Sequence, residues 1–418
     1  MLPELPRDER AVLVHVDFMS DMLHEDLQEF QELVTSAGVT IAEIVTTRRR
    51  SPHAKYYIGL GKAEQLLASV RQHQADVVIF NHALSPAQER NLERLLQCRV
   101  MGRIGLILDI FAQRARTFEG KLQVELAQLN HMATRLVRGW THLERQKGGV
   151  GLRGPGETQL ETDRRLLRAR VKSINKRLER VRSQRNQGRR ARERASIPTV
   201  SLVGYTNAGK STLFNCLSMA EVYTADKLFA TLDPTLRHVE VKNFGGVILV
   251  DTVGFIRHLP HELIEAFRAT LEETQLADLL LHVHDITNAS CQSHTEQVNE
   301  VLGEIGADKV PMLQVYNKID LIPDMQPRIE RNQQGIIDKV WLSAKTGAGI
   351  ALLWQALAER LAGELVITKL VLEPQAAKLR ASLYAKGYVV NETILDDGQF
   401  ELTVKMPRIA FERLALYR

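Results

Sequence analysis

Residues 204–211 combine two glycines, a lysine and a serine at the spacing that a phosphate-binding loop requires. They match G-x-x-x-x-G-K-[ST] and read Gly204, Tyr205, Thr206, Asn207, Ala208, Gly209, Lys210 and Ser211. An apolar run precedes them and a helical pattern follows, which is the context that the motif needs. Backbone N–H groups of such a loop surround phosphate oxygens, the lysine adds a cation, and the serine hydroxyl can bind Mg²⁺. A chance glycine-rich turn is the alternative for this motif alone.

Three further polar motifs follow apolar runs that have the character of buried strands. They are Asp251, Thr252, Val253 and Gly254; Asn317, Lys318, Ile319 and Asp320; and Ser343, Ala344 and Lys345. An acid in the first can hold a magnesium-bound water, and the Gly254 N–H can meet a γ-phosphate. The Asp320 carboxylate can accept hydrogen bonds from guanine N1–H and N2–H₂, and the Ala344 N–H can bond guanine O6. Because adenine lacks that donor pair, the motifs predict a site for GTP and GDP.

A candidate switch loop lies between the phosphate-binding loop and Asp251. It reads Phe229, Ala230, Thr231, Leu232 and Asp233, followed by Pro234 and Thr235. Such a loop needs a threonine that completes the magnesium shell and senses the γ-phosphate. Thr231 is the first candidate for this role and Thr235 the second. We therefore predict Lys210, Thr231 and Gly254 as catalytic groups, Ser211 and Thr231 as ligands of Mg²⁺, and all five motifs as the nucleotide site.

One domain, residues 198–365, is expected to position all of these motifs. Its apolar runs alternate with helical stretches and are expected as strands at 199–203, 247–250, 279–284, 312–316 and 340–342. This alternation predicts a doubly wound parallel sheet, in which ligands bind outside the carboxyl ends of the strands. The four motifs that directly follow strands should therefore meet at one edge.

Smaller domains are expected at both ends of the chain. Residues 1–111 alternate between strand patterns at 11–17, 39–46, 77–81 and 99–101 and helix patterns at 23–36, 63–73 and 86–97, which predicts an α/β domain with a largely parallel sheet. Ser85, Pro86 and Gln88 form a helix start with a capping box. Residues 366–418 are expected as a small α+β domain, because 400–404 alternate in polarity and Asp397-Gly398 is a hairpin-turn signal.

A different periodicity marks residues 112–197. Apolar residues recur at spacings of three and four, first at Leu122, Leu126, Leu129, Ala133, Leu136, Trp140 and Leu143, and again at Leu167, Val171, Ile174, Leu178 and Val181. This is the seam of two helices packed as a coiled coil. A glycine-rich connector at 148–156 separates them, so we predict an antiparallel helical hairpin whose second helix frays into Gly188 and Pro198.

The second helix of this hairpin concentrates positive charge. Residues 164–194 contain fourteen Lys/Arg and two Glu, a local charge of +12; since the whole chain carries +5, the remainder carries −7. A one-sided run of this kind favours contact with a polyanion such as RNA over a merely solvated helix face.

Bulk composition narrows the class of protein. Hydrophobic residues make up 44% of the 418, charged residues 25%, and the longest apolar runs are far too short to span a membrane. Three widely spaced cysteines argue against a disulfide framework or a zinc site. Length alone suggests about three domains. We also expect no signal peptide, no stable membrane insertion, a monomeric chain, and a cytoplasmic location that leaves room for peripheral membrane association.

With these motifs in place, the sequence resembles the HflX family of GTPases, which is related to the Obg and Era translation GTPases. The likeness covers nearly the whole chain. It includes the glycine connector at 148–156, the segment 157–163 behind it, and Leu259-Pro260-His261. It implies an N-terminal α/β domain, a helical hairpin, a GTPase domain and a short C-terminal domain. It also implies binding to the large ribosomal subunit and its RNA, and the splitting of ribosomes under stress.

The sequence departs from Ras-like enzymes at one position, and two other functions remain open. Phe255 follows Gly254, where Ras-like enzymes place a glutamine that orients the attacking water, so catalysis should depend on another group, often from a partner. One alternative is a GTPase of transfer-RNA modification or ribosome assembly, which would share every nucleotide motif but lack the glycine connector and basic hairpin. The other is a GTP-switched binding module that acts on a membrane protein or a protease.

Overall fold

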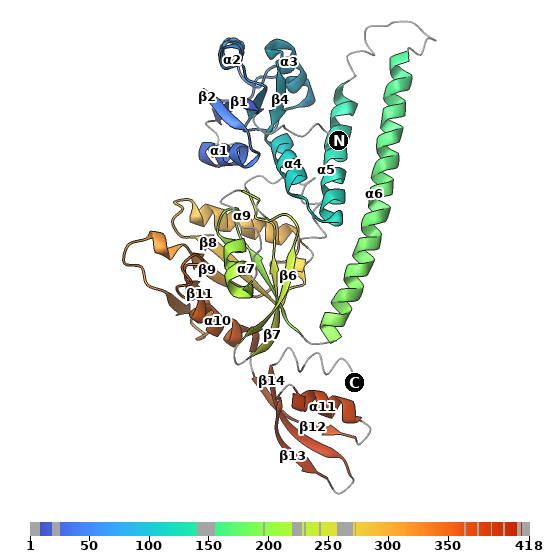
Figure 1. The fold of residues 1–418 in the computed structure, drawn as a ribbon, viewed down its shortest axis with the longest axis vertical. Coiled ribbons are helices and arrows are strands. Elements are labelled where there is room, and N and C mark those ends of the chain that lie inside the picture. The colour runs from blue at the N-terminus through green and yellow to red at the C-terminus, as the bar shows by residue number, and fades with distance from the viewer. Residues whose placement is uncertain are drawn as a thin grey trace.

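A computed structural model describes most of the chain. The described residues are 9–18, 26–139, 155–194, 197–219, 228–229, 231–241, 244–256, 271, 273–362, 365–373, 376–385, 387–395, 398–407 and 411. Figure 1 shows four parts: an N-terminal domain, a two-helix hairpin, a central domain and a C-terminal domain at the far end. Helix α6 (Pro155–Arg194) runs alongside the N-terminal and central domains.

The N-terminal domain is built on a parallel sheet of order β2-β1-β3-β4, as predicted. Its elements are β1 (Arg10–Phe18), α1 (Leu27–Ser36), β2 (Thr40–Arg49), α2 (Leu60–His73), β3 (Val77–Phe80), α3 (Pro86–Leu96), β4 (Arg99–Gly102) and α4 (Arg103–Arg114). The capping box of α3 forms between Ser85 and Gln88. The sequence patterns did not predict α4, which follows β4 directly and is mostly buried.

The hairpin consists of α5 (Phe118–Gly139) and α6, which run antiparallel. Leu122, Leu129, Ile174 and Leu178 form its buried seam, as the spacing predicts. Cross-helix ion pairs join Glu125 to Arg170 and Glu119 to Arg185.

Two details of the predicted hairpin are wrong, and part of it lies outside the described residues. Pro155 and Gly156 belong to α6 rather than to the connector, because proline is well tolerated in a first helical turn. The helix also continues through Gly188 to Arg194, since one glycine costs a long helix only about 1 kcal/mol. The connector residues 148–154 and Trp140 and Leu143 of the seam lie outside the described part of the chain.

The central domain has a seven-stranded sheet of order β10-β11-β9-β8-β5-β7-β6. Its elements are β5 (Thr199–Val203), α7 (Lys210–Ser218), β6 (Thr235–Val241), β7 (Gly245–Asp251), β8 (Leu279–Asp285), α9 (Cys291–Glu304), β9 (Met312–Asn317), η2 (Ile319–Leu321), β10 (Arg328–Arg331), β11 (Ile337–Trp341) and α10 (Ile350–Ala362). The five predicted strands are present and parallel. The sheet is mixed rather than purely parallel, because the polar edge strands β6 and β10 pair antiparallel to it.

A three-stranded antiparallel sheet and one helix form the C-terminal domain. They are β12 (Leu365–Leu372), α11 (Ala377–Ala385), β13 (Val389–Ile394) and β14 (Phe400–Pro407), in sheet order β12-β14-β13. The predicted hairpin joins β13 to β14, and Gly398 has a φ of 82° in its turn.

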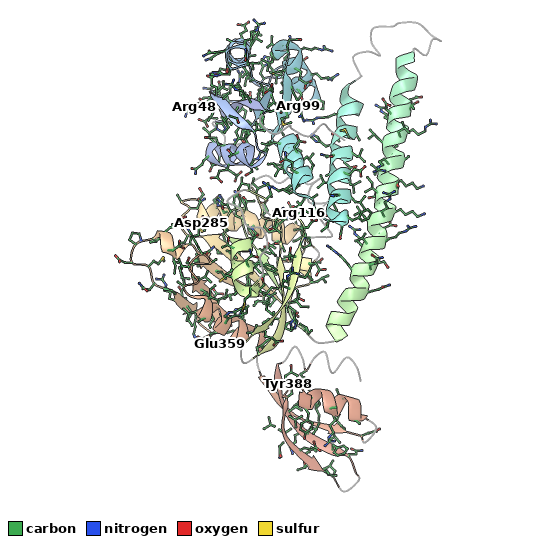
Figure 2. All side chains as sticks on the ribbon, in the orientation of Figure 1. Arg48, Arg99, Arg116, Asp285, Glu359 and Tyr388 are labelled. Carbon is green, nitrogen blue, oxygen red and sulfur yellow. The ribbon has the colours of Figure 1, made fainter. Side chains whose placement is uncertain are left out.

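The N-terminal and central domains share one hydrophobic core. Phe30 and Phe111 of the first domain belong to the same buried cluster as Val203, Phe229 and Phe255 of the second. Arg116 lies where this junction meets the base of the hairpin (Figure 2). Within the described residues, none of the helices combines the length and the apolar character needed to cross a membrane.

Candidate nucleotide-binding site

The phosphate-binding loop connects β5 directly to α7. The strand ends at Val203 and the helix begins at Lys210, so the N–H groups of the first helical turn face the loop. Gly209 has a φ of 89°, and a Cβ placed there would overlap the side-chain amide of Asn317. Glycine is therefore required at this position by backbone conformation and by space.

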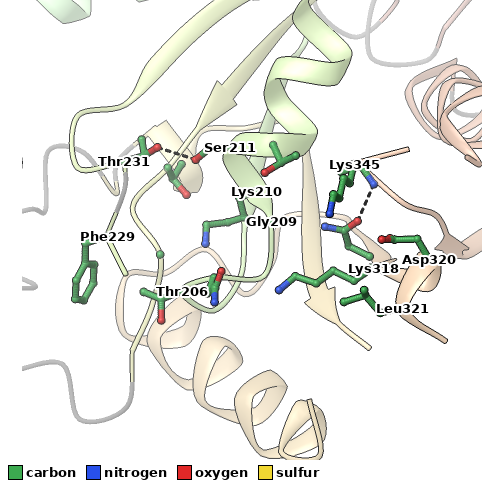
Figure 3. A pocket seen from close by; sticks show the side chains of 16 residues that line it. Thr206, Gly209, Lys210, Ser211, Phe229, Thr231, Lys318, Asp320, Leu321 and Lys345 are labelled. Atoms are coloured by element: carbon green, nitrogen blue, oxygen red, sulfur yellow. Dashed lines mark hydrogen bonds between the residues drawn. The ribbon is translucent and has the colours of Figure 1, made fainter. Parts of the chain in front are cut away.

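A cavity of about 540 Å³ opens in front of this loop. Figure 3 shows Lys210, Ser211 and Thr231 on one side of it and Lys318, Asp320 and Leu321 on the other. Fourteen predicted residues line it: Thr206, Asn207, Gly209, Lys210, Ser211, Phe229, Thr231, Thr252, Gly254, Asn317, Lys318, Asp320, Ala344 and Lys345. The fold thus brings together residues from all five motifs.

Three side-chain oxygens converge at one end of the cavity. Ser211 Oγ lies 2.7 Å from Thr231 Oγ1 and 2.7 Å from Asp251 Oδ2. Asp251 is fully buried, and its Oδ1 atom has no hydrogen-bond partner among the described residues. Hard oxygen donors of this kind fit Mg²⁺. Ser211 and Thr231 would hold the ion and Asp251 a water on it, and the ion would supply positive charge to the β- and γ-phosphates.

Lys210 is the cation at the centre of the site. Its ammonium is buried and donates to the carbonyl of Tyr205 at 2.7 Å. Burial lowers the pKa of Lys210 to about 8, although the nearby Asp251 carboxylate opposes this. Burial likewise raises the pKa of Asp251, against its hydrogen bond from Ser211 and the charge of Lys210. Phosphate oxygens would replace the hydration that the Lys210 ammonium has lost.

The predicted base-binding motifs form the other end of the cavity. Asn317 links the phosphate-binding loop to the 343–345 motif. Its amide donates to Ala208 O at 2.9 Å, and its Oδ1 accepts from Ala344 N at 2.9 Å. The Ala344 N–H, which we expected to meet guanine O6, thus donates to Asn317 in this structure. Asp320 is exposed at the cavity rim, and Lys318 forms an ion pair with Asp285 at 2.7 Å.

The remaining predicted residues support the cavity without lining it. They are Gly204, Tyr205, Ala208, Leu232, Asp233, Asp251, Val253, Ile319 and Ser343, while Ala230 lies outside the described residues. Conversely, Thr212 and Leu321 line the cavity although they were not predicted. Leu321 is 61% exposed beside Asp320, so a flat apolar contact for a base is available there. The sequence could have indicated both residues, because each directly follows the last residue of a predicted motif.

Phe255 does not face the phosphate end of the cavity. Its side chain is 3% exposed and belongs to the core shared by the N-terminal and central domains. Its backbone extends β7 beside the phosphate-binding loop, since Thr206 N donates to Phe255 O at 2.7 Å and Phe255 N donates to Gly204 O at 3.1 Å. The described residues therefore place no water-orienting side chain at this position. The segment Leu259-Pro260-His261 lies outside them.

Sequence comparisons with known proteins identify family models along most of the chain. Four family models match in succession: GTP-binding GTPase N-terminal at 24–112, GTP-binding GTPase Middle Region at 114–192, 50S ribosome-binding GTPase at 199–318, and HflX C-terminal domain at 329–415. A GTP-binding protein from the archaeon Sulfolobus solfataricus, solved with GDP, is similar in structure. It is 25% identical with a TM-score of 0.45, and the match covers 84% of this chain and 97% of that one.

Two relatives match nearly end to end. The GTPase HflX of Escherichia coli (strain K12) is 60% identical over 406 residues, which are 97% of this chain and 95% of the relative. The GTPase HflX of Caldanaerobacter subterraneus subsp. tengcongensis is 44% identical over 95% of this chain and 91% of its own length. With a phosphate loop, an oxygen cluster suited to a metal ion and a base-binding edge in one cavity, the chain is a P-loop GTPase that belongs to the HflX family.

Proposed function

We propose that this GTPase binds the large ribosomal subunit through its hairpin, hydrolyses GTP to GDP and phosphate with Mg²⁺, and separates ribosomal subunits under stress. The match of residues 199–318 to a family described as 50S ribosome-binding supports the partner. The stress-linked splitting role follows from the family resemblance.

The observation that carries the proposal is the cationic surface of α6. Ile174 and Leu178 bury the helix against α5, which leaves most of its basic residues exposed. The exposed cations are Arg165, Arg168, Arg170, Lys172, Lys176, Arg177, Arg180 and Arg182. Among them, Arg170 pairs with Glu125 of α5. Ribosomal RNA presents regularly spaced phosphates, and arginine binds phosphate oxygens with two parallel hydrogen bonds.

Hydrolysis by the free protein should be slow because the described site lacks a side chain to orient water. Lys210 and the metal ion would stabilise charge on the β- and γ-phosphates, and the Gly254 N–H would bond a γ-phosphate oxygen. The missing element is the alignment of the attacking water. We propose that docking on ribosomal RNA supplies it, so that GTP is the binding state and GDP the release state.

GTP turnover with and without purified large ribosomal subunits tests this function. In Arg168→Glu/Arg177→Glu/Arg180→Glu, stimulation by the subunits should disappear while basal turnover stays unchanged. A matched variant, Arg71→Glu/Arg94→Glu/Lys309→Glu, changes the charge equally on exposed residues outside the hairpin and should keep full stimulation. Full stimulation of the first variant would exclude the hairpin as the docking element.

Light scattering of intact ribosomes separates splitting from the alternatives. Addition of the protein with GTP should lower the scattered intensity as subunits come apart, and GDP should not. A GTPase of transfer-RNA modification or subunit assembly would leave intact ribosomes unchanged.

A further inference from the structure

A carboxylate of the central domain holds the first turn of the hairpin. Asp233 Oδ2 accepts hydrogen bonds from Arg116 N at 2.9 Å and from Thr117 N at 2.8 Å, and Asp233 Oδ1 bonds the Thr117 hydroxyl. Thr117 in turn accepts from Gly120 N at 2.9 Å, as the residue that caps α5. The positive end of α5 is thus bound by an anion that lies 116 residues away in sequence.

The same aspartate lies two residues from the predicted magnesium ligand Thr231. Leu232 between them is 3% exposed, so its side chain packs in the core next to both contacts. Two residues span about 7 Å when fully extended. Thr231 Oγ1 lies 2.7 Å from Ser211 Oγ, so Leu232 alone separates the residue that contacts Ser211 from the residue that binds the start of α5.

The fit between Asp233 and α5 is close. A Cβ at Gly120 would overlap Asp233 Oδ1, so any side chain at position 120 would displace the carboxylate. The residues before Asp233 are also docked on the N-terminal domain: Leu228 N donates to Ser36 Oγ at 3.0 Å, and Phe229 packs edge-on against Phe111 at 4.7 Å. Figure 2 places Arg116 at this junction.

We propose that Asp233 is a positioning residue, which holds Thr231 against Ser211 by binding the start of α5 and so couples the nucleotide to the hairpin. When Mg²⁺ and GTP hold Thr231, the Asp233 contact is kept. GDP has no γ-phosphate to hold Thr231, so the first turn of α5 loosens when GDP is bound. Coupling of this kind acts in both directions. It operates within the chain and requires no ribosome, so it can be tested independently of the proposed function.

The variant Gly120→Ala tests the coupling without altering the central domain. Alanine favours a helix, yet its methyl group would expel Asp233. Single-turnover GTP hydrolysis by Gly120→Ala should fall about tenfold while GDP affinity stays within about twofold. Asp233→Ala should give the same split, because a methyl group cannot accept the hydrogen bonds from Arg116 N and Thr117 N. The matched control is Gly61→Ala in the first turn of α2, where an added methyl meets nothing within 4 Å; it should behave as wild type.

Hydrogen exchange of residues 116–121 gives a readout that a merely structural role would not move. In wild type these amides should exchange more slowly with a non-hydrolysable GTP analogue than with GDP. In Gly120→Ala and Asp233→Ala that difference should vanish.

Three results would overturn the proposal. One is wild-type hydrolysis by Gly120→Ala. Another is impaired hydrolysis by Asp233→Ala alone, which would place Asp233 at the nucleotide itself. The third is an equal loss of GDP and GTP affinity in both variants, which would indicate general unfolding.

Discussion

At the scale of single residues, the site depends on buried polar groups behind the phosphate-binding loop. His282 and His284 lie on β8 with ring centroids 4.0 Å apart, and both are almost completely buried. They show no metal-ligand geometry, and no cluster of His, Cys, Asp and Glu suited to a metal ion occurs among the described residues. Their burial within the sheet is that of structural groups.

Base recognition at Asp320 leads to a first prediction. Asp320→Asn replaces a carboxylate acceptor with a donor, so the bond to guanine N2–H₂ is lost. Affinity for GTP should fall at least about 100-fold, and affinity for xanthosine triphosphate, which has a carbonyl at that position, should rise. Fluorescent-nucleotide titration measures both. Asp308→Asn, an exposed aspartate in the α9–β9 loop, should change neither affinity. Equal binding of ATP and GTP by wild type would contradict the assignment.

Acid should destabilise the central domain through His284. Burial lowers its pKa from 6.5 to about 4, so the folded domain holds the ring neutral while the unfolded chain protonates it. Stability is therefore complete above pH 6.5, is lost as the pH falls from 6.5 towards 4, and changes no further below 4. At pH 5 the loss from this group should be about 2 kcal/mol.

Urea unfolding at pH 7.5 and pH 5 checks this value. A Trp140→Phe background leaves Trp341 and Trp354 of the central domain as fluorescent reporters. Between these two pH values, the unfolding free energy of His284→Gln should fall by about 2 kcal/mol less than that of wild type. If the unfolding free energies of wild type and His284→Gln depend on pH identically, the acid sensitivity belongs to other groups. His282 is one candidate, because burial and the charge of His284 also lower its pKa.

At the scale of elements, the two helices of the hairpin meet in a small core. The seam between its two helices contains four buried apolar residues, whereas the central domain and the N-terminal domain each bury far larger clusters. The basic residues of α6 repel one another, so the helix depends on this seam and on the two ion pairs with α5. The hairpin should therefore open before either neighbouring domain unfolds.

Truncation of one seam residue should show that the hairpin opens before the neighbouring domains unfold. Ile174 is fully buried, and Ile174→Ala should cost the hairpin about 2–5 kcal/mol. Hydrogen exchange should speed up throughout α6 while intrinsic GTP hydrolysis and GDP affinity remain normal. Leu166→Ala, on the same helix but at a position 60% exposed, is the matched control and should change exchange little. Unaltered exchange in Ile174→Ala would mean that α6 is stable without α5.

At the scale of the whole molecule, the N-terminal and central domains form one packed body. Phe111 of α4 and Phe229 of the candidate switch loop pack together in the core that both domains share. A buried polar chain crosses the same boundary, because the Tyr205 hydroxyl bonds Glu29, and Glu29 forms an ion pair with Arg103. Tyr205 belongs to the phosphate-binding loop, so the N-terminal domain contacts both the loop and the switch.

Cooperative unfolding of these two domains follows from the shared core. Phe111→Ala should cost about 3–5 kcal/mol, and the loss should appear in Trp341 and Trp354 fluorescence although both tryptophans lie outside the N-terminal domain. Hydrogen exchange in β1 and β3 should show a similar decrease in the free energy of unfolding. Leu383→Ala, in the separate core of the C-terminal domain, should leave the tryptophan transition in place. Separate transitions for the two domains in Phe111→Ala would show that they fold independently.

The sequence alone determined the elements whose chemistry is local. A phosphate-binding loop, a base-recognition motif and a two-helix seam each depend on residues close together in the chain, so their spacing predicts them. The edge strands β6 and β10 were missed because half-exposed polar strands have weak local signals. Only the tertiary structure decided that Phe255 is buried in a core shared with another domain and that Asp233 binds the start of α5. Both depend on contacts between residues far apart in sequence, which no local pattern encodes, because they arise only when complete domains pack against each other.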